Sequence, residues 1–244
     1  MRFSWLKGIG LPPPGSYFRP RPRLAVDRII SLGGLCEAAF QARRLSGSDR
    51  AYVFDWWITP LASVFVTLEK GAASAFAPER LVKVPNYGGQ AALYSRLSRT
   101  IHLHEFPKGA DFLALDVKTI AKTLQEKYAA LHTRLLADCA SGTTLFVRQR
   151  LKGHDPEGED LNRAVERLSA LLSTIASDCH LLILDYGPLP PRERLIQAQV
   201  QRLRDANDLG SNKGWDSLFR ALAIDCRKSG PGFAYKDLQI SLTP

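Results

Sequence analysis

Short apolar runs alternate with amphipathic stretches along most of the chain. Helical periodicity is clearest over residues 116–142, where apolar side chains recur at a spacing close to 3.6 residues. Further helices are predicted at residues 36–45, 61–69, 161–178 and 215–227, the second with Thr59 as its N-cap and Pro60 in its first turn. Strands are predicted at residues 23–33, 99–107, 143–150 and 179–187, with an edge strand at 234–242.

The order strand, helix, strand, helix, strand is typical of βαβ units. It predicts an α/β fold with a mostly parallel sheet and flanking helices. Neither an internal repeat nor a linker interrupts residues 26–244, so we expect one domain there. Residues 1–25 are rich in Pro, Gly and Arg and are expected to form a separate basic arm. In such a fold, ligands bind beyond the carboxyl ends of the strands.

Composition narrows the class of protein without identifying its partner. The chain has 244 residues, of which 45% are hydrophobic and 23% charged, as in an ordinary globular protein. The net charge of +9 admits an anionic partner, but Lys and Arg are spread along the chain, so we do not expect nucleic-acid binding. No apolar run approaches the length of about 20 residues that spans a bilayer, and the N-terminus lacks the apolar segment of a signal peptide. The low density of cysteines leads us to expect a reduced, cytoplasmic protein, and the sequence indicates no oligomeric state.

The cysteines are widely spaced and include no CxxC pair, so no structural zinc site, cofactor or disulfide framework is expected. Cys36 is the most informative of them, because it follows Gly33 and Gly34 between a predicted strand and a predicted helix. A helix N-terminus favours thiolate and offers N–H groups to an oxyanion, and the glycines allow close approach of a substrate. A buried cysteine that only fills space is the alternative, and on the residue pattern alone it is the commoner case.

A cysteine nucleophile needs a base, for which histidine is the usual choice. His102 and His104 share one face of a predicted extended segment, because residues i and i+2 of a strand point the same way. They could form a zinc pair, but no third ligand stands out nearby. His132 and His154 are expected at the surface, and His180 opens a predicted core strand.

Four short motifs bear a resemblance to a known family. They are "SLGGLC" at residues 31–36, "FDWW" at 54–57, "HEF" at 104–106 and "FVR" at 146–148, with a late aromatic motif, "WDSLF", at 215–219. The chain resembles a family of uncharacterised bacterial proteins described as "putative papain-like cysteine peptidases", from about residue 28 to 220. Two positions depart from the family pattern: Val53 replaces a proline before "FDW", and Glu105 replaces an aspartate after the histidine.

The resemblance implies Cys36 as the nucleophile and His104 as the general base. Asp55 is the first choice for the group that orients the imidazole, with Asp185 and Glu105 as alternatives. A papain-like fold is α+β, with its histidine on an antiparallel sheet, and this is the alternative to the parallel α/β fold that the pattern predicts. The two expectations conflict, and the strand–helix alternation favours α/β.

The same resemblance suggests how a substrate is held. Gly33, Gly34 and Trp56 are expected to line the substrate site, although Trp56 could also be core. Arg148 could bind a substrate carboxylate or phosphate bidentately, or be a structural partner of Asp55 or Glu105. The predicted function is a cysteine-dependent hydrolase of the peptidase or amidase type, or an acyltransferase, acting on a small-molecule, peptide or glycan substrate. The alternative is a non-catalytic module that binds a sugar or nucleotide in a glycan-related pathway.

Overall fold

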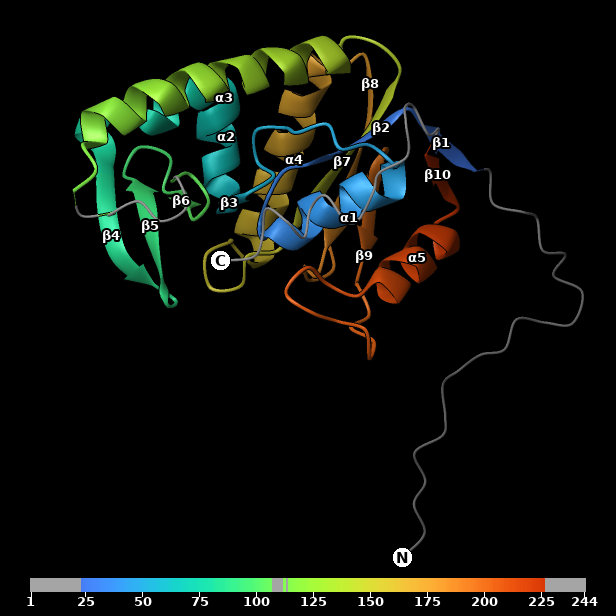
Figure 1. The fold of residues 1–244 in the computed structure, drawn as a ribbon. Helices are drawn as coiled ribbons and strands as arrows, with labels where there is room; N and C mark the ends of the chain where they lie inside the picture. The colour runs from blue at the N-terminus through green and yellow to red at the C-terminus, as the bar shows by residue number, and fades with distance from the viewer. Residues whose placement is uncertain (1–22, 107–111, 113, 227–244) are drawn as a thin grey trace, which may run out of the picture.

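A four-stranded parallel sheet forms the centre of the computed structural model, which describes residues 23–106, 112 and 114–226. Every neighbouring pair in this sheet is parallel (Figure 1). In spatial order the strands are β2 (Arg28–Ser31), β7 (Thr143–Gln149), β8 (Asp178–Leu184) and β9 (Leu195–Ala198). The sheet therefore follows from the strand–helix alternation in the sequence.

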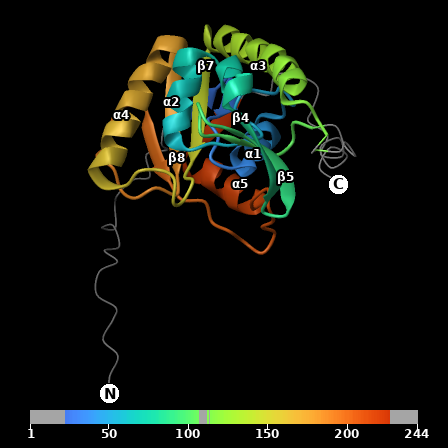
Figure 2. The same cartoon turned by 90° about the vertical axis from the view of Figure 1, so that its left-hand side faces the viewer.

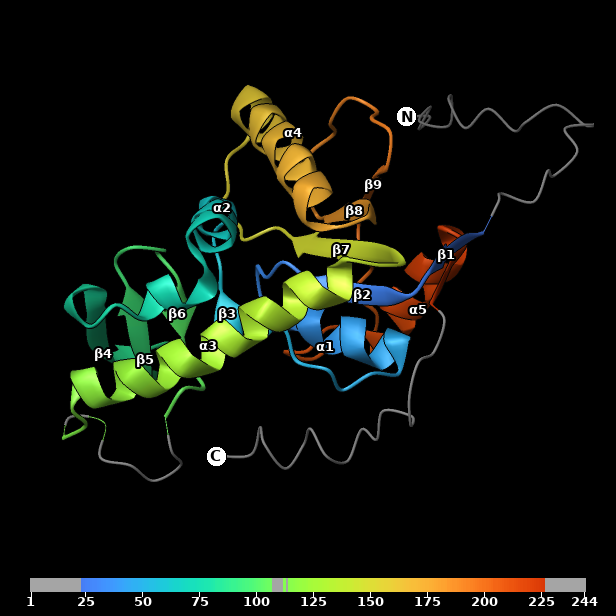
Figure 3. The ribbon, with the colours of Figure 1, turned by 90° about the horizontal axis from the view of Figure 1, so that it is seen from above.

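Helices cover both faces of the parallel sheet, because successive residues of each strand point to opposite sides. Ile30 and Phe146 pack with apolar side chains of α2 (Leu61–Lys70), α3 (Val117–Cys139) and α4 (Gly158–Ile175). Ile29 and Leu145 pack with those of α1 (Cys36–Ser46) and α5 (Asn212–Ala221). Figure 3 shows α4 on one side of the strands and α1 with α5 on the other, and α2 packs beside α4 (Figure 2).

A second sheet is antiparallel and lies beneath the half of α3 that is farther from the parallel sheet, on the left in Figure 1. Its strands, in spatial order, are β3 (Trp57–Ile58), β6 (Ile101–His102), β5 (Gln90–Ser95) and β4 (Leu81–Tyr87). Two short 3-10 helices, η1 (Ala72–Phe76) and η2 (Pro78–Arg80), connect α2 to this sheet. Near the other end of the molecule, β1 (Leu24–Val26) pairs in parallel with β10 (Ile224–Cys226).

The mixed α/β class and the presence of a parallel sheet are confirmed, and α1 to α4 lie where helices were predicted. An antiparallel sheet was expected only in the α+β alternative, and the sequence pattern did not predict its strands β4 and β5. Residues 83–90 have the composition of a turn, yet they form most of β4 and the hairpin in which Tyr87 pairs with Gln90. The strand predicted at 99–107 is reduced to the two residues of β6, and a stretch that looked irregular contains β9.

Some predictions fall outside the described residues. The edge strand at 234–242 lies there, as does the basic arm up to residue 22. Leu24 and Ala25, assigned to the end of that arm, belong to β1, and the division into arm and domain stays a prediction. In the described part of the chain, no helix has the length and apolar character needed to cross a bilayer.

Candidate functional site

The turn between β2 and α1 is built from two glycines in left-handed backbone conformations. Gly33 has φ of +76° and Gly34 of +104°, a region that costs glycine little. A Cβ on Gly34 would lie 2.3 Å from the carbonyl oxygen of Gln149, and one on Gly33 would lie 2.9 Å from Thr59. Close packing of three chain segments therefore requires both glycines, and their predicted contact with a substrate stays a prediction.

Cys36 is the first residue of α1 and is partly exposed. Burial raises the pKa of its thiol to about 11; its own backbone N–H opposes this shift, and the negative charge of Asp55 adds to it. Burial therefore opposes the thiolate form that the helix N-terminus was expected to favour. No histidine contributes to the shift, and none in the described part of the chain hydrogen-bonds the Cys36 Sγ.

His104 lies two residues beyond β6, against Trp56. The two rings meet edge to face with their centroids 6.0 Å apart. Although the imidazole reaches the surface, the protein packed around it lowers its pKa, and Lys127 lowers it further while Glu105 opposes this. At neutral pH the ring is therefore mainly uncharged, which is the form able to accept a proton.

His102 does not share a face with His104, in contrast to the prediction. Strand β6 ends at His102, so the alternation of side chains does not continue. Its ring is fully buried against Trp57, with centroids 4.6 Å apart, and its Nε2 is 2.9 Å from the Thr100 hydroxyl. Burial lowers the pKa of His102 to about 3. Within the described residues, no cluster of His, Cys, Asp and Glu side chains could hold a metal ion.

Asp55 pairs with α1 rather than with a histidine. Its Oδ2 accepts hydrogen bonds from Arg43 Nη2 at 2.7 Å, from Arg43 Nε at 3.2 Å and from the Tyr52 N–H at 2.9 Å. Burial raises the pKa of Asp55, and Arg43 opposes that shift. The Arg43 guanidinium also lies over the Trp56 ring, 5.4 Å from its centroid. Asp55, Arg43, Trp56 and His104 therefore contact one another in that order, without a direct bond from Asp55 to the imidazole.

The two alternative orienting acids have other partners. Glu105 accepts a short hydrogen bond from the Tyr128 hydroxyl and one of 2.8 Å from Lys127, which fastens the "HEF" segment to α3. Asp185 follows β8 and accepts a hydrogen bond from the Val200 N–H at 3.1 Å. Neither carboxylate has a hydrogen bond to His104 in the described part of the chain.

Arg148 lies at the centre of a fully buried network. Its Nε donates to the Tyr186 hydroxyl, its Nη1 to the carbonyls of Leu32 and Thr59, and its Nη2 to both oxygens of Asp155. All five N–H donors of the guanidinium are thus used within the protein. The predicted substrate contact is not available in this arrangement, and the structural partner is Asp155 rather than Asp55 or Glu105.

Asp155 is an important residue that the sequence did not reveal, because it stands in a stretch that looks like a solvated loop. Besides Arg148 and Tyr186, it accepts hydrogen bonds from the backbone N–H groups of Leu61 at 2.6 Å and Leu151 at 2.8 Å. It therefore stabilises the start of α2, the role that was predicted for Thr59. The Asp-Pro dipeptide is a local signal for a turn and says nothing about burial.

Glu37, next to Cys36, is a second residue that the sequence did not reveal. It is only 2% exposed, and its carboxylate accepts hydrogen bonds from Gln149 Nε2 at 3.0 Å, Arg202 Nη2 at 2.9 Å and Trp215 Nε1 at 2.9 Å. A Cβ on Gly210 would lie 2.4 Å from its Oε1. The "WDSLF" motif on α5 is thereby tied to the first turn of α1.

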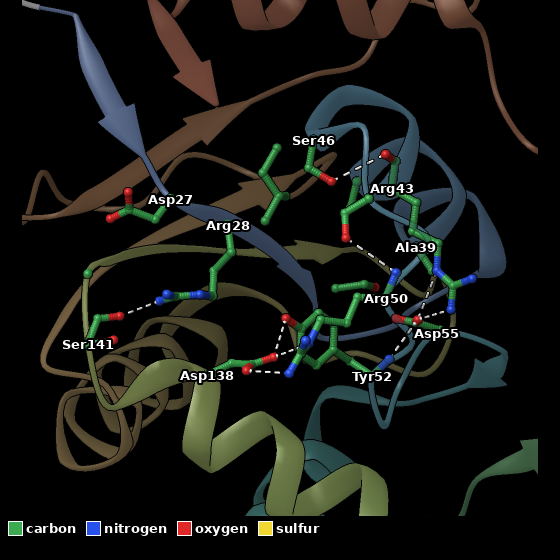
Figure 4. Close-up of a pocket in the computed structure, with 15 residues that line it drawn as sticks. Asp27, Arg28, Ala39, Arg43, Ser46, Arg50, Tyr52, Asp55, Asp138 and Ser141 are labelled. Carbon is green, nitrogen blue, oxygen red and sulfur yellow. Dashed lines mark hydrogen bonds and ion pairs between the residues drawn. The ribbon is translucent and has the colours of Figure 1, made fainter. Parts of the chain in front are cut away.

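A charged cavity of about 500 Å³ lies between α1 and β2 (Figure 4). Ser31 of "SLGGLC" and Asp55 of "FDWW" both line it, so these two motifs meet there. Ala39 also lines it, one helical turn beyond Cys36. Arg28 from β2 and Arg50 from the segment after α1 complete its charged walls.

A family model described as "Putative papain-like cysteine peptidase" matches residues 27–168, which is more than half of the chain. The protein belongs to this family. The match includes β2, the Cys36 turn and β7, and it ends within α4. The comparison with curated proteins and the comparison with solved structures each found no match.

For this member of the papain-like cysteine peptidase family, the structure reconciles two expectations that conflicted. Cys36 begins a helix that packs on a parallel sheet, as the strand–helix alternation implied. His104 follows a strand of an antiparallel sheet, as the family name implied. Asp55, Trp56 and His104 lie in one neighbourhood, and the charge of Asp55 adds to the raised pKa of Cys36. Arg148 lies in a separate buried network.

Proposed function

We propose that the protein is a cysteine-dependent hydrolase of the peptidase or amidase type, or an acyltransferase, with Cys36 as its nucleophile. The observation that carries the proposal is the position of Cys36: a partly exposed thiol in the first turn of α1, beyond the carboxyl end of β2. Membership of the papain-like cysteine peptidase family supports thiol chemistry at this position.

In the proposed reaction, His104 takes the proton from the Cys36 Sγ as the sulfur attacks the substrate carbonyl carbon. The oxyanion that forms is stabilised by the free N–H groups at the start of α1. The imidazolium then returns the proton to the departing amine or alcohol, and water or another acceptor releases the acyl group from sulfur. Catalytic hydrogen bonds often tighten only when substrate is bound, so the proposal requires His104 to approach Cys36 in that complex.

Acylation by p-nitrophenyl acetate, located by peptide mass spectrometry, tests this proposal. We expect acetylation of Cys36 in the wild-type protein, none at that position in Cys36→Ser, and at least a hundredfold slower acetylation in His104→Gln. Cys226→Ser is the matched control, because Cys226 is also partly exposed and burial raises its pKa to about 11 as well. Acetylation of Cys36 no faster than that of Cys226 would contradict the proposal.

A non-catalytic binding function is the second candidate. It is favoured by the protonated state of the Cys36 thiol, which has no histidine partner in this arrangement. In that case Cys36 fills space beside a binding site for a sugar or nucleotide. An equal affinity of wild type and Cys36→Ser for a ligand, together with no acetylation of Cys36, would favour binding over catalysis.

A further inference from the structure

We infer that the cavity between α1 and β2 binds a small hydroxylated ligand carrying one phosphate or carboxylate group, such as a sugar phosphate or sugar acid, with its anionic group on Arg28. The inference goes beyond thiol chemistry at Cys36 and does not depend on it. The cavity volume of about 500 Å³ lies within the range of small-molecule sites and is large enough for such a ligand.

Arg28 is the arginine of this cavity whose charge is least compensated. Its Nη1 donates to the Ser141 carbonyl at 2.6 Å and to the Thr144 hydroxyl at 2.9 Å, and both acceptors are neutral. Among the described residues, no ion pair joins Arg28 to a carboxylate; the nearby Asp27 carboxylate lies with it beside Gly142. These bonds fix the guanidinium in place and leave N–H donors of its planar fork for a bidentate anion.

The other two arginines of the cavity already have carboxylate partners. Arg43 binds Asp55 at 2.7 Å, and Arg50 binds Asp138 through two bonds of 2.6 and 2.7 Å. Figure 4 shows Arg28 on the side of Ser141 and the Arg43–Asp55 pair on the opposite side. These pairs add no net charge, but their carboxylates retain lone pairs that can accept hydrogen bonds from ligand hydroxyl groups.

Asp27 limits what the cavity can accept. Its carboxylate lines the same cavity and accepts a hydrogen bond from the Thr143 N–H at 2.8 Å. A second anionic group on the ligand would be repelled by it, whereas a hydroxyl group could donate to it. One anionic group for Arg28, with hydroxyl groups for the carboxylates of the walls, is therefore the ligand chemistry that this set of side chains fits.

Isothermal titration calorimetry with glucose 6-phosphate, glucuronate and glucose, which measures the affinity of each probe, tests the inference. We expect saturable binding of one or both anionic probes, at least tenfold tighter than that of glucose, and a loss of about tenfold or more in Arg28→Gln. Arg28→Lys should regain part of the affinity, and the exposed Arg96→Gln, outside the cavity, should bind as wild type does. Glucose 6-phosphate and glucuronate separate a phosphate site from a carboxylate site.

Ser48→Trp provides a second variant, because loss of Arg28 also removes two structural hydrogen bonds. Ser48 is half-exposed and lines the cavity, so a bulky side chain there should obstruct it without changing its charges. No saturable binding of either anionic probe to wild type, or wild-type affinity in both Arg28→Gln and Ser48→Trp, would overturn the inference. Cys36→Ser should bind the probes normally, so this result is independent of whether Cys36 is acylated.

Discussion

Replacing Arg148 with methionine should destabilise the protein strongly, because it leaves the Asp155 carboxylate buried without its counter-ion. Both side chains of this ion pair are 0% exposed, and their closest N–O distance is 2.7 Å. The substitution keeps most of the side-chain volume but removes donors to Asp155, to the Tyr186 hydroxyl and to two buried carbonyl groups. The perturbation therefore changes charge and hydrogen bonding far more than packing.

The expected magnitude follows from the burial of this pair. Removing one partner of a buried ion pair typically costs about 3–5 kcal/mol, since the remaining charge is desolvated and unpaired. Asp155 keeps the N–H groups of Leu61 and Leu151, so the carboxylate is not wholly without donors. For a chain of this size, such a loss corresponds to a fall in Tm of roughly 6–20 °C.

Urea unfolding at neutral pH, followed by tryptophan fluorescence, measures the effect. Arg163→Met is the matched control: Arg163 pairs with Asp160 and Glu159 on the surface of α4, where its side chain is 64% exposed. This variant should lose no more than about 1 kcal/mol. If Arg148→Met is as stable as Arg163→Met, the structural role derived for Arg148 is wrong, and its predicted role in substrate binding becomes the better explanation.

Two further predictions concern the network at Cys36 and the dependence of stability on pH. Glu37→Gln should lower the free energy of unfolding by about 2–4 kcal/mol, because the carboxylate accepts hydrogen bonds from the charged Arg202 and from the neutral donors of Gln149 and Trp215. A changed tryptophan fluorescence of the folded protein should accompany the loss, and an unchanged urea midpoint would refute this prediction. The pKa of His102 lies at about 3 when folded, below its ordinary value of 6.5, so the unfolded chain binds the proton first and stability is lost as pH falls below about 6.5. Urea unfolding at pH 7 and pH 5 should show that His102 contributes a loss of about 2 kcal/mol in the free energy of unfolding between these pH values. The variant His102→Gln should lack this contribution, and an equal loss in that variant would contradict the assignment.

The parallel sheet could be predicted from sequence because its signal is local. Strands β7 and β8 are compact apolar runs, and α4 between them buries Leu161, Val165, Leu168 and Leu172 at helical spacing. The antiparallel sheet has a weaker signal: β4 is half-buried and contains Pro85, and β3 and β6 have two residues each. The Gly88–Gly89 pair between Tyr87 and Gln90 is nevertheless a recognised hairpin signal, and it could have identified β4 and β5.

The residues of the candidate site could be predicted only in part. The turn at Gly33 and Gly34 and the helix that starts at Cys36 follow from local pattern. The partners of Arg148 and Glu37 do not, because each network joins segments far apart in the chain: Leu32 lies 116 residues from Arg148, and Trp215 lies 178 residues from Glu37. A motif shows that a charged residue is present, but only the fold shows whether its donors face the protein or a ligand.

Asp55 connects the two halves of the candidate site, since it lines the cavity beside α1 and its charge raises the pKa of Cys36. With a thiol pKa of about 11, forming the thiolate at pH 7 costs about 5 kcal/mol. A nucleophilic role for Cys36 therefore requires that His104 remove the proton during attack, or that a ligand lower this cost. Because Asp55 is held by Arg43, a bound ligand that altered this pair would change the electrostatic potential at the sulfur as well.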